Sequence, residues 1–206
     1  MGSSDRAGTG RQETEPAGLC AFVDESMRLT PDDAGTYLLV AAVAETGRCE
    51  ELRQTVRSLL YKKQKRLHWR DEEAPRRTKI AETVGGLQMT ATVVIGMPLA
   101  KSKQERARRK CAEALLPHLQ AMGVTQVVME ARTPSLVEAD RRLVTALRGK
   151  RLITAELRVD TARAQEEPLL WVPDAIAGAY GAARTLGRTD WLELVGTVQE
   201  IAVSTR

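Results

Sequence analysis

The hydrophobic pattern divides the chain into short apolar runs and longer amphipathic stretches. Two apolar runs of strand length stand near the start, at residues 19–27 and 37–44, and a turn rich in Pro, Asp and Gly separates them. Turn residues between two such runs are typical of a β-hairpin. Continuous apolar runs are typical of strands buried on both faces. We therefore expect the chain to open with a hairpin inside a covered sheet.

Beyond the hairpin, the pattern alternates between helical and strand periods. Leu52, Val56, Leu59 and Leu60, for example, follow the i, i+4, i+7, i+8 spacing of a helix. Helices are predicted at 49–63, 75–84, 103–122 (with Ser102 as its cap), 134–147, 168–186 and 191–203, and further strands at 89–99, 124–131 and 152–160. This order predicts an α/β domain with a mixed sheet, antiparallel at the start and parallel later.

The ends and the composition suggest one intracellular domain. Residues 1–17 are small, polar or charged, so we expect a disordered tail before a single domain at 18–206. The chain has no apolar stretch approaching the roughly 18 residues of a membrane span, and its start lacks the apolar region of a signal peptide. The three cysteines have no metal-ligand spacing, which favours reduced thiols and a cytoplasmic location.

Carboxylates stand at the ends of apolar segments that we expect to be buried. Asp24 and Glu25 end the apolar part of the first strand, Glu130 ends a later strand, and Asp174 lies among small residues of a late helix. Buried carboxylates are costly without a cation, and hard divalent cations prefer oxygen ligands. Converging carboxylates would form a divalent-metal site. Because side chains alternate along a strand, we expect Asp24 rather than Glu25 to face it.

These residues also carry a resemblance to a known family. The chain resembles the ribonuclease H-like fold, and within it a bacterial family of unknown function with an Asp-Glu-Ser motif on the first strand. The matching segments are 22–26 (FVDES), the apolar strand 37–44 and 169–179 (LLWVPDAIAGA), within a likeness over roughly residues 19–183. Met27 and Pro173 depart from the usual Gly and Ala of that family, although Pro suits the first turn of a helix.

The resemblance implies a metal-dependent nuclease or other phosphodiester hydrolase. It places Asp24, Glu130 and Asp174 as ligands of Mg²⁺ or Mn²⁺, with Glu25 and His68 assisting. Two such ions about 4 Å apart activate a water and stabilise the leaving oxygen of a phosphodiester. His68 lies in a basic connector, where an imidazole could contact a phosphate or transfer a proton.

Ordinary structural roles remain open for the same carboxylates. Glu130 could pair with Arg132 or Arg141, and Asp174 could simply cap its helix. Asp140 is a further candidate for the middle ligand, although its arginine neighbours favour a solvated position on a helix. The sequence alone does not decide between these roles and metal binding.

Three basic clusters, at 62–66, 106–110 and 148–151, suggest an anionic partner. Nucleic-acid binding needs such residues to neutralise phosphates, and the net charge of +4 permits it. Basic stretches on helices are also common as solvated faces. Aromatic residues are scarce, which argues against base stacking. Two alternatives to the nuclease stay open: a non-catalytic nucleic-acid- or protein-binding module on the same fold, and an enzyme acting on a small phosphorylated substrate.

Overall fold

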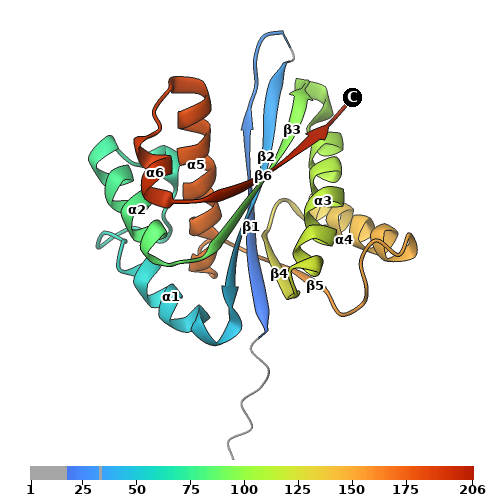
Figure 1. Cartoon of the computed structure of the whole chain (residues 1–206), viewed down its shortest axis with the longest axis horizontal. Helices are drawn as coiled ribbons and strands as arrows, with labels where there is room; N and C mark the ends of the chain where they lie inside the picture. Colours follow the sequence, from blue (N-terminus) through green and yellow to red (C-terminus); the bar gives the residue numbers. More distant parts are fainter. Residues whose placement is uncertain (1–17, 33) are drawn as a thin grey trace, which may run out of the picture.

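The computed structural model describes residues 18–32 and 34–206. The expected tail at 1–17 lies outside this range. A six-stranded sheet forms the centre, in the order β5-β4-β1-β2-β3-β6 (Figure 1). Its strands are β1 (Leu19–Arg28), β2 (Gly35–Glu45), β3 (Thr90–Leu99), β4 (Val124–Glu130), β5 (Arg158–Ala162) and β6 (Val198–Ser204).

The strand directions confirm the predicted mixed sheet. β1 pairs antiparallel with β2, and β2 antiparallel with β3, so the predicted hairpin and a third strand form the antiparallel part. β4 then pairs parallel with β1, and β5 parallel with β4. β6 adds a parallel strand to the other edge, beside β3.

Helices cover both faces of the sheet. Figure 1 shows α1, α2, α5 and α6 on one side and α3 and α4 on the other. The helices are α1 (Cys49–Arg57), α2 (Ala74–Gly86), α3 (Gln104–Ala121), α4 (Pro134–Gly149), α5 (Trp171–Leu186) and α6 (Asp190–Val195). None of the helices in the described part of the chain is long and apolar enough to cross a membrane.

The alternation of side chains along β1 builds two separate cores. Cys20 and Phe22 face the core under α1, α2 and α5, whereas Ala21 and Val23 face the core under α3 and α4. All four are almost fully buried. Because a strand covered on both faces needs no polar alternation, this explains the continuous apolar runs in the sequence.

Two predicted elements near the C-terminus are correct only in part. The helix expected at 191–203 is a short helix, α6, followed by strand β6; Gly196 separates them with φ of 94°. The strand expected at 152–160 is confined to β5, because Ile153 and Leu157 are buried in irregular backbone instead. In both cases, the spacing of apolar residues indicated which side chains are buried but did not indicate the backbone conformation.

Two helix ends also differ from the prediction. α1 ends at Arg57 and not at 63, so the basic cluster 62–66 lies in a connector that leads Leu67 and Trp69 into the core. Ser102 does not cap α3, since it lies inside a short 3-10 turn and the helix starts without a side-chain cap.

Candidate functional site

The parallel register of β1 and β4 brings Asp24 next to Glu130. Val23 is the register partner of Met129, so the next residue along each strand is Asp24 on β1 and Glu130 on β4. β4 ends at Glu130, whereas β1 continues to Arg28. The sheet therefore opens beside β1 just where the two carboxylates stand.

Asp174 reaches the same place from above the sheet. It lies in the first turn of α5, a helix that packs over β1 and β2. Its carboxylate accepts the backbone N–H of Trp69 at 2.7 Å and lies 3.1 and 3.2 Å from Nδ1 of His68. The connector that carries His68 is thereby attached to α5 at the position of Asp174.

One cavity of about 310 Å³ gathers all five residues named from the sequence. Asp24, Glu25, Glu130, Asp174 and His68 line it together. Three arginines complete the polar lining: Arg66, Arg108 and Arg132. We call this space the carboxylate cavity.

The surroundings of Asp24 strongly shift the pKa of its carboxyl group. Its side chain is buried, and Oδ1 accepts the backbone N–H of Glu25 at 2.7 Å. Burial raises the pKa of Asp24 well above its usual range, and a hydrogen bond with Glu130 and the charges of Glu130 and Asp174 raise it further. Two carboxyl groups this close need either a shared proton or a cation between them.

His68 is more basic than a free imidazole. The hydrogen bond with Asp174 raises its pKa, burial opposes that shift, and the charge of Asp174 adds to it. The pair resembles the carboxylate–imidazole pairs that orient a histidine for proton transfer. The ring remains about one-third exposed, at 35%, so it stays accessible from the cavity side of the connector.

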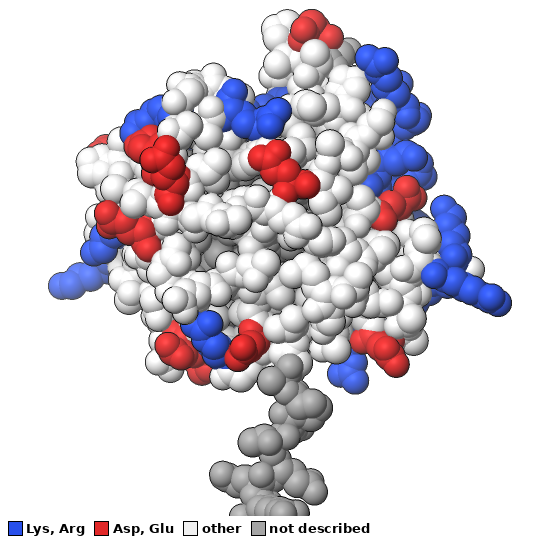
Figure 2. Space-filling model, viewed as in Figure 1, with Lys and Arg blue, Asp and Glu red and all other residues white. Residues whose placement is uncertain are grey.

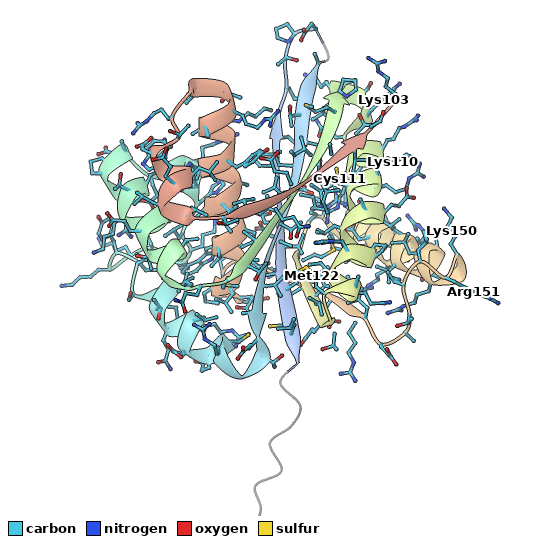
Figure 3. The ribbon with its side chains drawn as sticks, viewed as in Figure 1. Lys103, Lys110, Cys111, Met122, Lys150 and Arg151 are labelled. Carbon is cyan, nitrogen blue, oxygen red and sulfur yellow. The ribbon has the colours of Figure 1, made fainter. Side chains whose placement is uncertain are left out.

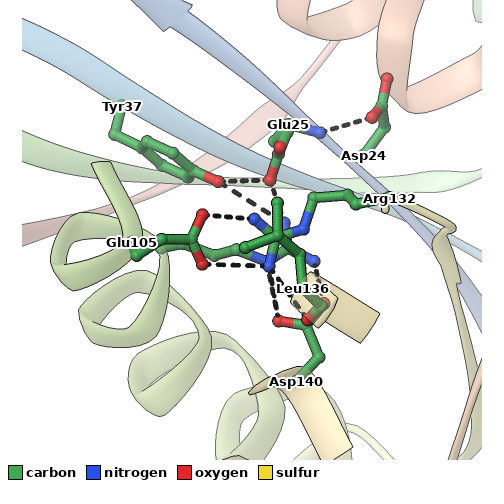
Figure 4. Close-up of polar contacts among 8 residues, drawn as sticks. Asp24, Glu25, Tyr37, Glu105, Arg132, Leu136 and Asp140 are labelled. Atoms are coloured by element: carbon green, nitrogen blue, oxygen red, sulfur yellow. Dashed lines mark hydrogen bonds and ion pairs between the residues drawn. The ribbon is translucent and has the colours of Figure 1, made fainter. Parts of the chain in front are cut away.

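Glu25 points to the opposite face of β1 and joins a different network (Figure 4). It accepts hydrogen bonds from the Tyr37 hydroxyl and from Arg108. Arg108 also holds Asp140 in a two-pronged ion pair, with both N···O distances 2.9 Å. Burial raises the pKa of Tyr37, which keeps this hydroxyl a donor. The expectation that Asp24 and Glu25 face different sides is confirmed; an assisting role for Glu25 stays a prediction.

Asp140 corrects a sequence-based interpretation. It is buried between Arg108 and Arg132 and not solvated on its helix. Since Glu130 lines the carboxylate cavity and Asp140 does not, the geometry favours Glu130 as the middle carboxylate. The nearest cationic partner of Glu130 is Arg66, at 3.9 Å. Arg132 pairs with Glu105 and Arg141 with Glu138, so neither of the two possible pairings of Glu130 with these arginines forms.

The chemistry of the donors fits a hard divalent cation. Asp24, Glu130 and Asp174 offer carboxylate oxygens, and the close approach of Asp24 to Glu130 is of the kind that a cation relieves. No group of three or more His, Cys, Asp and Glu residues within 18–32 and 34–206 is already arranged to hold a metal ion. The oxygens of Asp174 contact His68 and the backbone N–H of Trp69.

Arg108 was missed as a functional residue because it looked like one cation in a basic cluster. Its spacing carried the signal: Cys111, Ala112 and Leu115 follow it at i+3, i+4 and i+7, and all three are buried. Arg108 therefore stands on the apolar face of α3, where a charge needs partners. The cluster 106–110 is thus not a uniform solvated run.

Comparison with known proteins finds likeness in structure alone. No protein-family model and no curated protein matches the sequence. A chain of the PCNA:RNase HII complex from Archaeoglobus fulgidus is 15% identical, with a TM-score of 0.49 over 85% of this chain and 75% of that chain. The ribonuclease H2 from Pyrococcus horikoshii OT3 is 13% identical, with a TM-score of 0.44 over 82% and 77%. A mutant of Bst-RNase HIII is 12% identical, with a TM-score of 0.47 over 83% of this chain but 56% of that chain.

At these identities, and with TM-scores below 0.5, the likeness carries no argument about activity or about the fold family. The architecture is the predicted one: a single α/β domain whose three antiparallel strands continue into two parallel strands, with helices on both faces. That this architecture is the ribonuclease H-like fold stays a prediction. Membership in the Asp-Glu-Ser family stays a prediction.

Proposed function

We propose that this protein is a divalent-metal-dependent phosphodiester hydrolase of the ribonuclease H-like type, acting on nucleic acid. One observation carries the proposal: Asp24, Glu130 and Asp174, from β1, β4 and α5, line the same cavity. These three carboxylates would hold Mg²⁺ or Mn²⁺. When bound, such an ion supplies a water of lowered pKa and stabilises the charge on a leaving oxygen.

The remaining residues of the cavity have roles in binding and proton transfer. Arg66 is 43% exposed and sits 3.9 Å from Glu130, so it is placed to contact a phosphate that enters beside that carboxylate. His68, oriented by Asp174, holds a proton at the cavity wall and is the candidate acid or base. Arg132 is held by Glu105 and Asp140 and contributes a fixed positive charge.

Cleavage assays on the double variant Asp24→Asn/Asp174→Asn test the proposal. Purified protein with Mn²⁺ should cleave at least one of single-stranded RNA, single-stranded DNA and an RNA–DNA hybrid. The double variant should lose more than about a hundredfold in rate, because it loses several kcal/mol of charge stabilisation. Asp160→Asn is the matched control, since Asp160 is exposed on β5 outside the carboxylate cavity. Equal activity in all three proteins would contradict the proposal.

A non-catalytic binding module on the same fold is the second candidate. The observation that favours it is the arrangement of Asp174. Its oxygens contact His68 and the backbone N–H of Trp69, and among the described residues it does not form a preformed ion-binding group with Asp24. Calorimetric titration with Mg²⁺ and Mn²⁺ separates the two functions. Saturable heat that Asp24→Asn abolishes supports the hydrolase, and the absence of heat at millimolar metal supports the module.

A further inference from the structure

A second cavity, of about 500 Å³, lies between α3 and α4. Two of the basic clusters that lie far apart in the sequence, 106–110 and 148–151, meet there. Exposed arginine and lysine side chains from both helices line it: Arg106, Arg109, Arg142 and Lys150. We call it the α3/α4 cleft.

The positive charge of the cleft is compensated only in part. Of its acidic lining residues, Glu105 is paired with Arg132, and Asp140 is paired with Arg108 and Arg132. Glu113 is the remaining one. Within 18–32 and 34–206, neither Arg109 nor Lys150 has an ion-pair partner within 4.0 Å.

The other two cations of the cleft have partners outside its lining. Arg142 lies 4.0 Å from Glu138, at the limit of an ion pair, and Arg106 bonds to the backbone oxygen of Arg206. Within the described residues, Arg109 and Lys150 are therefore the cleft cations without an ion pair, and Glu113 is the acidic lining residue without one.

The surface around the cleft extends the same charge. Figure 3 shows Lys103 just before α3, Lys110 on α3, and Lys150 and Arg151 just after α4, all on this side of the molecule. In Figure 2, Lys and Arg side chains gather along this side of the molecule, although some acidic groups lie between them. A positive surface of this kind attracts a polyanion along its length.

The two helices that form the cleft are held at a fixed spacing. Arg108 on α3 forms an ion pair with Asp140 on α4. Arg132, which follows β4, donates hydrogen bonds to Glu105 on α3 and to Asp140 on α4. Of the residues that make these contacts, Glu105, Arg108 and Asp140 line the cleft. A preformed site loses less conformational entropy when a ligand binds.

The cleft adjoins the carboxylate cavity. Arg108 lines both spaces, and the ion pair between Glu105 and Arg132 joins a wall of one to a wall of the other. The lining of the cleft contains no aromatic side chain on which a base could stack. The partner that fits is therefore a long polyanion bound through its phosphates and independently of base sequence.

We infer that the α3/α4 cleft binds the phosphodiester backbone of a nucleic-acid strand, next to the segment that occupies the carboxylate cavity. The inference rests on the proposed function for the position of the scissile phosphate. Binding in the cleft itself needs neither metal nor cleavage.

Fluorescence anisotropy of the full chain tests this site. The probes are fluorescein-labelled single strands and an RNA–DNA hybrid of about 20 nucleotides, longer than typical single-strand sites. Every protein carries Asp24→Asn and is kept in EDTA, so that cleavage plays no part. The triple variant Arg109→Gln/Arg142→Gln/Lys150→Gln is compared with Arg57→Gln/Arg163→Gln/Lys79→Gln. The control set is also exposed, removes the same charge and lines neither space.

The cleft variant should bind about tenfold more weakly than the parent protein. Its salt dependence should also fall by about 2 in the slope of log K against log salt, the value for three lost contacts to a single strand. The control should stay within twofold, and all proteins should melt alike by circular dichroism. Equal weakening in both variants, or none in the cleft variant, overturns the inference. If the binding results follow this pattern but the parent protein does not cleave in the separate assay with Mn²⁺, only the proposed function is overturned.

Discussion

At the scale of single residues, Arg108 holds together the ion pairs beside the carboxylate cavity. It is almost fully buried on α3 and contacts Glu25 and Asp140 at once. A buried charge without a partner costs several kcal/mol, so each of these groups is tolerable only because the others are present. The network also fixes Glu25, the neighbour of Asp24 on β1.

Arg108→Met should lower the free energy of unfolding by about 3–5 kcal/mol, because it leaves the half-buried Glu25 without its arginine and the buried Asp140 with Arg132 alone. Urea unfolding followed by circular dichroism measures the change. Arg109→Met is the matched control, since Arg109 is the exposed next residue, and it should stay within about 0.5 kcal/mol of the parent protein. A loss no larger than that of the control would show that Arg108 is dispensable for stability.

At the scale of elements, Gly178 lets α5 approach the His68 connector. The helix passes so close to the Trp69 ring that a Cβ at Gly178 would overlap the ring atoms. Trp69 in turn meets Trp191 edge-to-face, with ring centroids 5.3 Å apart. The backbone N–H of Trp69 donates a hydrogen bond to Asp174. The packing of the Trp69 ring therefore positions one carboxylate of the candidate site.

Gly178→Ala should destabilise the protein by about 1–3 kcal/mol through overpacking, despite the roughly 1 kcal/mol that Ala normally gains over Gly in a helix. Denaturant unfolding gives the free energy, and tryptophan fluorescence reports the displaced ring. Gly86→Ala, in α2, meets no atom within 4 Å, and it should be neutral or stabilising. Stabilisation by both substitutions would contradict the close packing of α5 on Trp69.

At the scale of the whole molecule, the proposed metal site joins β1, β4 and α5, three elements distant in the sequence. An ion held by all three binds the folded state and not the unfolded chain. Such binding raises stability by mass action. Folding stability thus reports on metal binding without any assay of activity.

Mn²⁺ at about 100 times its dissociation constant should raise stability by about 2.7 kcal/mol, which corresponds to roughly 5–10 °C in melting temperature for a domain of this size. Differential scanning calorimetry with and without Mn²⁺ provides the measurement. The shift should vanish in Asp24→Asn/Asp174→Asn and persist in Asp160→Asn. A melting temperature that does not respond to metal in the parent protein argues for the binding module.

The sequence by itself determined the features that depend on local periodicity. Turn residues between two apolar runs predicted the β1–β2 hairpin, and strand alternation separated Asp24 from Glu25. The tertiary structure alone decided which charges meet. It buried Asp140 against Arg108, joined Glu130 to Arg66 and made a strand of β6 beside the edge of β3. The reason is physical: a local pattern records whether a side chain is buried, whereas its partner is set by segments that only folding brings together.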